Sequence, residues 1–587
     1  PGDKSTVRIG NLRTMLDKMQ HPHGSAHSTF IDNDTGITLG RVAKSTPHQS
    51  VVPGWCEAED YVIAVDGHIA THALPEGRQP EAAARLLAEL RHNPAAFPAG
   101  LDGHFALSVW DRKEHMLTLA RDPFGVKPLF YYRTPSGALL FASELQALLA
   151  HPGVERTVNR DALIAYLAFG FIPAPYCIFE NIFKLCPAEM LTMGAGQAVQ
   201  KSLYWQQPDF APEKRPMAEC AAATREHVLN EVYKQVKGKS RVGLYFSGGL
   251  DSMIVLAALQ ELGIADVHTF TLGFTGPSVR SALRADLDVS AGYAKSYGAT
   301  HHEIVIDEQH QPLEWSPDVE RQLDEPMLTP NFYSKSLIAK AAGHAGIDLC
   351  LNGSMSELGF KIFTPKQFRK LRFAGGAKLS AMEMVLAKNN HFLPFEKIDQ
   401  LVRVPAGSSR EMATHIIERQ MTKSSYHNFI DLHKHLMVSM IGAAKSVAVQ
   451  ERGAALHRLD MRFPFLSKDL LQFARTIPIE LHVDKTNAIP GKAVLVKAFE
   501  DRLPEELLRR KKVGFPSYYW HQDELSLLIE QLLSESAVRQ AGLLDPKTTA
   551  ELLAEDKQSQ KKSAGKYTWG LLVLHFWHKL HAVRSEK

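Results

Sequence analysis

Apolar and polar residues follow one another in short alternating runs over the first two hundred residues. Tyr61–Val65 and Phe105–Trp110 are such runs, and Gly, Pro and Asp turns separate them from short helical patterns. Apolar runs of this length between turn residues are typical of β-strands. The pattern predicts a sheet-rich α+β unit over residues 1–205.

The periodic pattern stops at residues 206–216, where prolines at 208, 212 and 216 stand among charged side chains. Neither a helix interior nor a central strand tolerates proline well. We therefore predict a linker at residues 206–216 and a second unit at residues 217–587.

Strand and helix patterns alternate after this linker. Val242–Phe246, Val267–Leu272 and Ile347–Leu351 have the apolar content of buried strands, and Met253–Leu262 that of a buried helix. Such alternation predicts a parallel sheet with helices on both faces. Beyond Leu351 the pattern is mostly helical, except that residues 554–566 carry few apolar side chains and are predicted to form a loop.

The composition is that of a globular protein, with 45% hydrophobic and 22% charged residues in 587. The net charge of +3 is too small to indicate nucleic acid as a partner, and no run approaches the ~20 apolar residues that span a bilayer. Neither nucleic acid nor a membrane is therefore expected as a partner. Five widely spaced cysteines and a start without a secretory signal predict reduced thiols and a cytoplasmic location.

Candidate chemistry concentrates in Ser247-Gly248-Gly249-Leu250-Asp251-Ser252, between a predicted buried strand and a predicted helix. The glycines allow a tight turn and close approach of a ligand, and the helix N-terminus favours an anion. Asp251 is placed to hold Mg²⁺ against phosphates. The alternative is an ordinary turn in which Asp251 caps the helix; the position at the carboxyl edge of a parallel sheet favours the phosphate site.

This loop resembles the pyrophosphate loop of N-type ATP pyrophosphatases, which split ATP into AMP and pyrophosphate while adenylating a substrate. Further segments, spread over almost the whole chain, resemble the glutamine-dependent asparagine synthetase family: Leu101–Ala106, Ala120–Leu129, Phe141–Leu145, Asp324–Pro326, Arg462–Leu466, Lys512–Pro516 and Trp569–Leu574. The resemblance implies an N-terminal α+β sandwich of the Ntn-hydrolase type with a glutaminase origin. It further implies an α/β parallel-sheet ATP-pyrophosphatase domain with a helical C-terminal part.

The resemblance also assigns roles to single residues, with ATP and Mg²⁺ as cofactors. ATP would bind at Ser247, Gly248, Gly249, Leu250, Asp251, Ser252, Leu272 and Gly353. Asp251 and Lys512 would be catalytic, because a cation at Lys512 would neutralise charge during adenylation. The alternative for Lys512 is a solvated basic patch with Arg510 and Lys511.

One segment of the second unit departs from the family pattern Ser-Gly-x-Gly-x-Asp-Glu, in which the Asp is the second Mg²⁺ ligand. The chain has Asn352-Gly353-Ser354-Met355-Ser356-Glu357, with Ser356 opposite that Asp. A hydroxyl is a weak Mg²⁺ ligand compared with a carboxylate. We predict that Glu357 or another acid takes over as a metal ligand, or else that metal binding is impaired.

The N-terminal unit departs more widely. Active glutaminases of the family begin with a nucleophilic cysteine, whereas this sequence begins with Pro1. The family motifs His-Arg-Gly-Pro-Asp, Arg-Leu-Ser-Ile and Asn-Gly-Glu correspond to His21–Ser25, Ala43–Thr46 and Asp66–His68. A carboxylate at position 66 would repel the oxyanion that the asparagine amide stabilises. We predict that the glutaminase activity is lost.

Two hypotheses follow for function. The first is an AMP-forming carbon–nitrogen ligase that joins a small-molecule carboxylate to an amine without glutamine, possible forms being an intermolecular ligation and the ring closure of β-lactam synthetases. The second is a non-catalytic scaffold or regulatory homologue. A homodimer is compatible with both.

Overall fold

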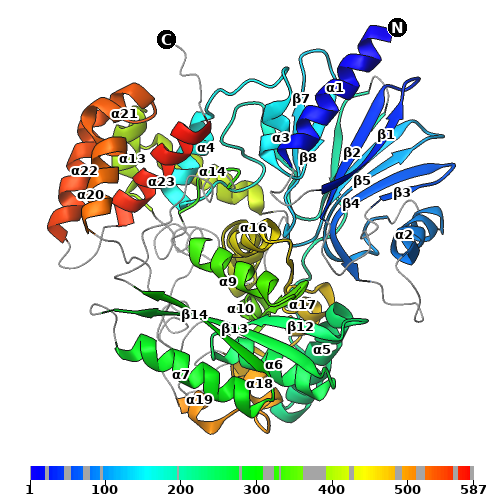
Figure 1. Cartoon of the computed structure of the whole chain (residues 1–587), viewed down its shortest axis with the longest axis vertical. Helices are drawn as coiled ribbons and strands as arrows, with labels where there is room; N and C mark the ends of the chain where they lie inside the picture. The colour runs from blue at the N-terminus through cyan, green and yellow to red at the C-terminus, as the bar shows by residue number, and fades with distance from the viewer. Residues whose placement is uncertain are drawn as a thin grey trace.

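The computed structural model of the chain is shown in Figure 1. It describes residues 2–19, 25–44, 55–70, 80–92, 97–194, 197–276, 281–307, 323–328, 332–360, 392–421, 429–482, 492–509, 522–559 and 566–581. Lys512, His21–Gly24 and residues 45–46, which the sequence analysis singled out, lie outside the described residues.

The N-terminal unit is built on antiparallel sheets. A six-stranded sheet has the order β11-β10-β6-β5-β4-β3, a three-stranded sheet the order β8-β7-β9, and β1 pairs with β2. The strands are β1 Ser25–Asp32, β2 Ile37–Lys44, β3 Trp55–Glu57, β4 Tyr61–Ala70, β5 Asp102–Asp111, β6 Met116–Arg121, β7 Phe130–Arg133, β8 Leu139–Ala142, β9 Ile182–Lys184, β10 Glu189–Gly194 and β11 Gln200–Leu203. The helices are α1 Gly2–Lys18, α2 Pro80–His92, α3 Leu145–Ala150 and α4 Arg160–Phe169.

Alternate side chains of the central strands enter two different cores. Ile63 and Phe105 pack on Leu86 and its neighbours in α2, whereas Val62 and Trp110 join the layer formed by β2, β7 and β8. Helices α1 and α3 pack against the far side of that second layer. The unit is therefore an α/β/β/α sandwich, which confirms the predicted fold class.

The second unit begins with α5 (Met217–Val236), after residues 206–216, which contain neither helix nor strand. Its sheet has the order β14-β13-β12-β15-β16, and every pairing is parallel, as predicted. The strands are β12 Arg241–Tyr245, β13 Asp266–Thr275, β14 Thr300–Asp307, β15 Leu349–Asn352 and β16 Asp460–Arg462. The helices nearest to it are α6 Leu250–Glu261, α7 Ser281–Ser296, α9 Phe332–His344, α10 Ser356–Phe360, α16 Ala448–Leu456, α17 Lys468–Ala474 and α18 Ala493–Ala498.

Helices cover both faces of this sheet because both faces are apolar. Val242 and Leu244 of β12 pack on the side of α5, α6 and α18, whereas Tyr245 and Phe270 pack on the side of α9 and α16. The arrangement places the carboxyl ends of β12 and β15, which are direct neighbours, at one edge of the sheet.

Most of the remaining helices form a core of their own, which also takes in α3 and α4 of the N-terminal unit. They are α13 Phe395–Val402, α14 Ser408–Gln420, α15 Phe429–Leu436, the π-helix η1 Met437–Val447, α20 Gln522–Leu533, α21 Glu535–Ala541, α22 Pro546–Ser559 and α23 Lys566–His581. The short helices η2 Ile479–His482 and α19 Glu505–Arg509 instead pack in the core on the α5, α6 and α18 side of the parallel sheet. Tyr166 of α4 donates a hydrogen bond of 2.7 Å to the Gly570 carbonyl. No helix among the described residues has the length and apolar content to cross a membrane.

A loop was predicted at residues 554–566. The prediction is wrong for residues 554–559, because α22 continues to Ser559. The segment is short of apolar side chains, but it is held by a polar contact. Buried Asp556 accepts hydrogen bonds from both the backbone N–H and the hydroxyl of Thr568, each at 2.9 Å. That contact joins α22 to α23, and no local pattern predicts it.

Stability is expected to fall on mild acidification, because burial lowers the pKa of both His68 and His482 to about 3. Unfolded histidine titrates near pH 6.5, so these side chains stabilise the fold fully above that pH and lose the contribution as the pH falls toward 3. At pH 5 the loss is about 2 kcal/mol for each. The urea midpoint should drop accordingly between pH 7.5 and pH 5.

The variant His482→Gln should reduce the loss at pH 5 by about 2 kcal/mol, because it removes one of several buried histidines, among them His575, whose pKa burial lowers. His344→Gln is the matched control, since His344 is exposed and should leave the pH dependence unchanged. An identical pH dependence in wild type and His482→Gln would contradict the assignment.

Candidate active site

The loop after β12 turns sharply at the carboxyl edge of the parallel sheet. The Phe246 N–H donates to the Phe270 carbonyl at 2.9 Å and so continues the sheet by one residue. Gly248 then has φ +61°, and a Cβ atom there would lie 2.7 Å from the hydroxyl oxygen of Ser290 in α7. Glycine is needed at this position because both the conformation and the space exclude a side chain.

Helix α6 starts directly after the turn, and its N-terminus has no side-chain cap. Gly249 is the N-cap residue, and the hydroxyl of Ser252 donates to the Gly249 carbonyl at 3.0 Å instead of accepting from the helix N–H groups. Uncapped N–H groups and the positive end of the helix dipole favour an anion here. Asp251 lies in the first turn of α6, where its charge is also favourable toward the helix dipole, so the phosphate site and the capped turn both stay predictions.

In the part of the chain that the structure describes, the carboxylate of Asp251 contacts side chains from two distant segments. Lys492 Nζ lies 2.6 Å from Asp251 Oδ1 and 2.8 Å from Oδ2, and the Ser356 hydroxyl donates to Oδ1 at 2.6 Å. Lys492 Nζ also donates to Ser356 Oγ at 2.6 Å, which closes a triangle. Lys492 and Ser356 are buried, whereas Asp251 is partly exposed.

Lys492 was not identified from the sequence. It precedes the apolar run Ala493–Ala498, a pattern that indicates a helix start but no chemistry. Its position as N-cap residue of α18 brings its ammonium group to loop 247–252, the predicted phosphate site. The structure thus adds a cation to the predicted site.

Asp251 offers the carboxylate that a magnesium ion would need at this site. Mg²⁺ is commonly held by one or two carboxylates together with substrate phosphates, and Ser356 adds a weaker neighbouring oxygen. Glu357, predicted as a second ligand, lies in the first turn of α10. Its role as a metal ligand stays a prediction.

The segment after β15 lies against the start of α6. Asn352 is buried, accepts a hydrogen bond from the Ser354 N–H at 2.9 Å, and donates to the side-chain oxygen of Gln450 in α16. Met355 has φ +79°, at the position where the family pattern has its second glycine. A methionine in this conformation is strained. The strained backbone is held by the contacts on either side of it.

Gly353→Ala is expected to impair the site while the fold survives. A Cβ atom at Gly353 would lie 2.7 Å from the Asp251 carbonyl oxygen and 2.9 Å from the Ser252 nitrogen, so the first turn of α6 must move. A displacement of about 1 Å in a catalytic group costs on the order of 100-fold in rate. The measurement is the rate of AMP formation alongside circular dichroism.

Gly343→Ala is the matched control, because a Cβ atom there meets its nearest neighbour, the His457 carbonyl oxygen, at an ordinary 3.6 Å. That variant should keep the wild-type rate. If Gly353→Ala also kept the rate, the close packing of β15 on α6 would not matter to the site.

The other predicted site residues are placed less directly. Leu272 lies on β13 and packs beside Tyr245 and Phe270, and its neighbour Thr271 donates a hydrogen bond to the Phe246 carbonyl. Its predicted contact with ATP stays a prediction. The role of Lys512 also stays a prediction, since that residue lies outside the described part of the chain.

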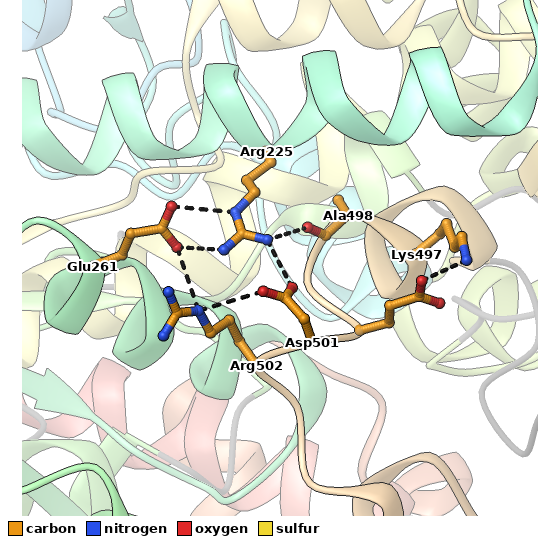
Figure 2. A network of polar contacts seen from close by, with 7 residues as sticks. Arg225, Glu261, Lys497, Ala498, Asp501 and Arg502 are labelled. Carbon is orange, nitrogen blue, oxygen red and sulfur yellow. Dashed lines mark hydrogen bonds and ion pairs between the residues drawn. The ribbon is translucent and has the colours of Figure 1, made fainter.

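A polar network holds the far ends of the two helices that carry Asp251 and Lys492 (Figure 2). Arg225 of α5 binds Glu261, the last residue of α6, at 2.7 Å, and Asp501, three residues beyond α18, also at 2.7 Å. Arg502 lies 3.9 Å from Glu261 and 3.5 Å from Asp501. These contacts join α5, α6 and the segment after α18. They thereby help to fix the relative positions of the helices that carry Asp251 and Lys492.

Asp66, at the position of the family's oxyanion-hole asparagine, belongs to a chain of ion pairs in the structure. Lys127 Nζ lies 3.5 Å from Asp66 Oδ1 and forms a closer ion pair with Glu451 of α16. Gly67 has φ +112°, and a Cβ atom there would lie 2.1 Å from the His104 carbonyl oxygen. Asp66 therefore presents a carboxylate that is paired with a lysine, where the family pattern has an amide.

Comparison with known proteins identifies the family to which this chain belongs. The asparagine synthase family model matches residues 223–579, and a glutamine amidotransferase domain model matches residues 3–205. Asparagine synthetase [glutamine-hydrolyzing] 1 of Bacillus subtilis is 26% identical over 97% of this chain and 93% of its own length. Amidase chry2 of Gibberella zeae is 20% identical over 94% of this chain and 92% of its own length.

A putative asparagine synthetase of Methanocaldococcus jannaschii is 34% identical over a shorter stretch, 30% of this chain and 34% of its own length. The asparagine synthase match alone covers more than half of the chain and includes Asp251, Ser356 and Lys492. The chain therefore belongs to the asparagine synthase family of ATP-dependent amidating enzymes.

Proposed function

We propose that this protein is an AMP-forming carbon–nitrogen ligase that adenylates a small-molecule carboxylate at loop 247–252 and joins it to an amine not released from glutamine. The observation that carries the proposal is the meeting of Lys492, Asp251 and Ser356 at the uncapped N-terminus of α6. A cation, a carboxylate and the N–H groups of a helix N-terminus are groups that phosphoryl and adenylyl transfer use.

Each group has a distinct task in this proposal. The N–H groups at the start of α6 bind phosphate oxygens, and the ammonium of Lys492 stabilises charge that develops on the departing pyrophosphate. Asp251 would hold magnesium, which when bound supplies positive charge to the phosphates. Asp251 also orients Lys492, because its two oxygens both accept from that ammonium.

The proposed independence from glutamine rests on the N-terminal unit. An oxyanion needs a hydrogen-bond donor, whereas Asp66 offers a carboxylate in an ion pair with Lys127. The altered motifs at residues 21–25 and 43–46 support the same reading. Ring closure within one substrate, as in β-lactam synthetases, and ligation of two substrates both satisfy the proposal.

The test is ATP–pyrophosphate exchange with the full chain, screened over amino acids and small carboxylic acids. Exchange requires adenylation but not the amine, so it identifies the carboxylate first. We expect exchange with one class of acid and no glutamine hydrolysis above background. Glutamine hydrolysis at a rate matching amide formation would overturn the second half of the proposal.

A non-catalytic homologue is the second candidate, and one observation favours it. Ser356 stands in place of the second metal carboxylate, and Lys492 neutralises Asp251. This candidate predicts nucleotide binding without exchange for any acid. The same screen therefore separates the two functions.

A further inference from the structure

A cavity of about 800 Å³ lies in the N-terminal unit, away from loop 247–252. It is enclosed by α1, by β2 and β4, and by the hairpin of β7 and β8, and one end reaches α16 in the second unit. Ligand pockets commonly have volumes of about 300–1,000 Å³. The cavity is therefore large enough for a small organic molecule.

Most of the wall beneath α1 is apolar. The cavity is lined by Leu12, Met15 and Leu16 of α1 and by the apolar cluster that contains Leu39 of β2, Leu129 and Phe141. Such a wall receives an alkyl chain or an aromatic ring favourably, whereas a polar group placed there without a hydrogen-bond partner costs free energy.

Helix α1 packs closely over this cavity because a glycine of β2 leaves room for it. A Cβ atom at Gly40 would lie 2.9 Å from both terminal methyl groups of Leu16. A larger residue would push α1 outward, since two methyl groups cannot both be displaced cheaply from a packed helix. The helix is therefore a fitted wall of the cavity.

Arg41, which lines the cavity beside Gly40, has unused hydrogen-bonding capacity. Its Nε donates to the Val65 carbonyl at 3.3 Å, but its terminal nitrogens have no hydrogen-bond or ion-pair partner among the described residues. Burial lowers the pKa of Arg41, and the nearby charge of Asp66 partly compensates. Two other cations of the wall differ, because Lys127 pairs with Glu451 and Arg452 pairs with Glu144.

We propose that this cavity binds a monocarboxylic acid with an apolar body, an acyl chain or an aromatic ring, and that Arg41 binds its carboxylate. The planar guanidinium matches a carboxylate with two parallel hydrogen bonds, and the terminal nitrogens of Arg41 are available for them. Glutamine fits this site poorly, because its side-chain amide would lie among leucine and phenylalanine side chains.

The test is calorimetric titration of the full chain with decanoate, 3-phenylpropanoate, decan-1-ol and glutamine. We expect one of the two acids to bind with a stoichiometry of one, at least about tenfold more tightly than decan-1-ol, the neutral analogue of decanoate. Absence of binding by both acids, or tighter binding of glutamine than of either acid, would overturn the proposal. This comparison needs no variant and so does not depend on the folding of one.

Variants then assign the residues. Arg41→Met should weaken the acid about tenfold and leave decan-1-ol unchanged, and Leu16→Trp, which fills the cavity, should weaken both. Arg133→Met is the matched control, because Arg133 is exposed on β7 and does not line the cavity. Equal affinity of the acid for wild type and Arg41→Met would refute the role of Arg41.

Discussion

Asp251→Asn is expected to lower the rate of AMP formation by a factor on the order of 10²–10³ or more, because it removes a charged contact from the site of adenylation. The exchange preserves the size of the side chain, and Asp251 is partly exposed, so the fold should persist. Asparagine is uncharged. It therefore offers no charged oxygen to a metal ion and does not compensate the ammonium of buried Lys492. Single-turnover AMP formation with a saturating acid substrate is the measurement.

Asp266→Asn is the matched control. Asp266 also lies on the parallel sheet, but at the amino end of β13, where it binds Arg241 at 2.7 Å. That variant should retain the wild-type rate. Undiminished AMP formation in Asp251→Asn would mean that the metal is held elsewhere, or that loop 247–252 no longer serves catalysis.

The elements that build the site could be predicted from the sequence because their signals are local. Val242–Phe246 predicted β12 within one residue, and Met253–Leu262 predicted α6, since buried strands and helices of α/β folds are nearly continuous apolar runs. A tight turn at Gly248 and Gly249 was predicted because these glycines stand between the two elements. The positive φ of Gly248 and its contact with Ser290 agree with that reasoning.

The contacts of the site could not be predicted in the same way. Lys492 meets Asp251 across 241 positions of sequence, and Lys127 meets Glu451 across 324. No periodicity encodes such pairs, because they depend on how whole elements are placed in the fold. The sequence shows a carboxylate at position 66 where the family pattern has an amide, but it does not show the lysine that pairs with it.

The surroundings of Ser356 show the same limit. The sequence predicts that Glu357 or another acid takes the place of the second metal carboxylate, and for Glu357 this stays a prediction. The hydroxyl of Ser356 reaches Asp251, and Lys492 supplies a positive charge at the same point. A cation from a distant segment thus stands beside the residue that replaces the family's second carboxylate.

Lys492→Met is expected to slow adenylation by a factor on the order of 10²–10³ and to weaken ATP binding much less, because the ammonium matters most where charge develops in the transition state. Methionine keeps the apolar stem of the side chain, so α18 should remain in place. Single-turnover AMP formation and ATP titration, run side by side, measure the two effects separately.

Lys497→Met is the matched control, since Lys497 lies on the same helix and pairs with Glu500 at the surface (Figure 2). It should leave both the rate and ATP binding unchanged. A non-catalytic homologue would show no AMP formation in wild type, and both lysine variants would then differ at most in ATP affinity.

Magnesium dependence gives a further readout of Lys492 that a purely structural role would not change. In the wild type a metal ion must compete with the ammonium for the two oxygens of Asp251, which lie 2.6 and 2.8 Å from Nζ. Removing the ammonium leaves the carboxylate uncompensated, so half-maximal activity should be reached at a lower magnesium concentration although the maximal rate falls. A lower rate with an unchanged magnesium requirement would show that Lys492 acts on the phosphates without any coupling through Asp251.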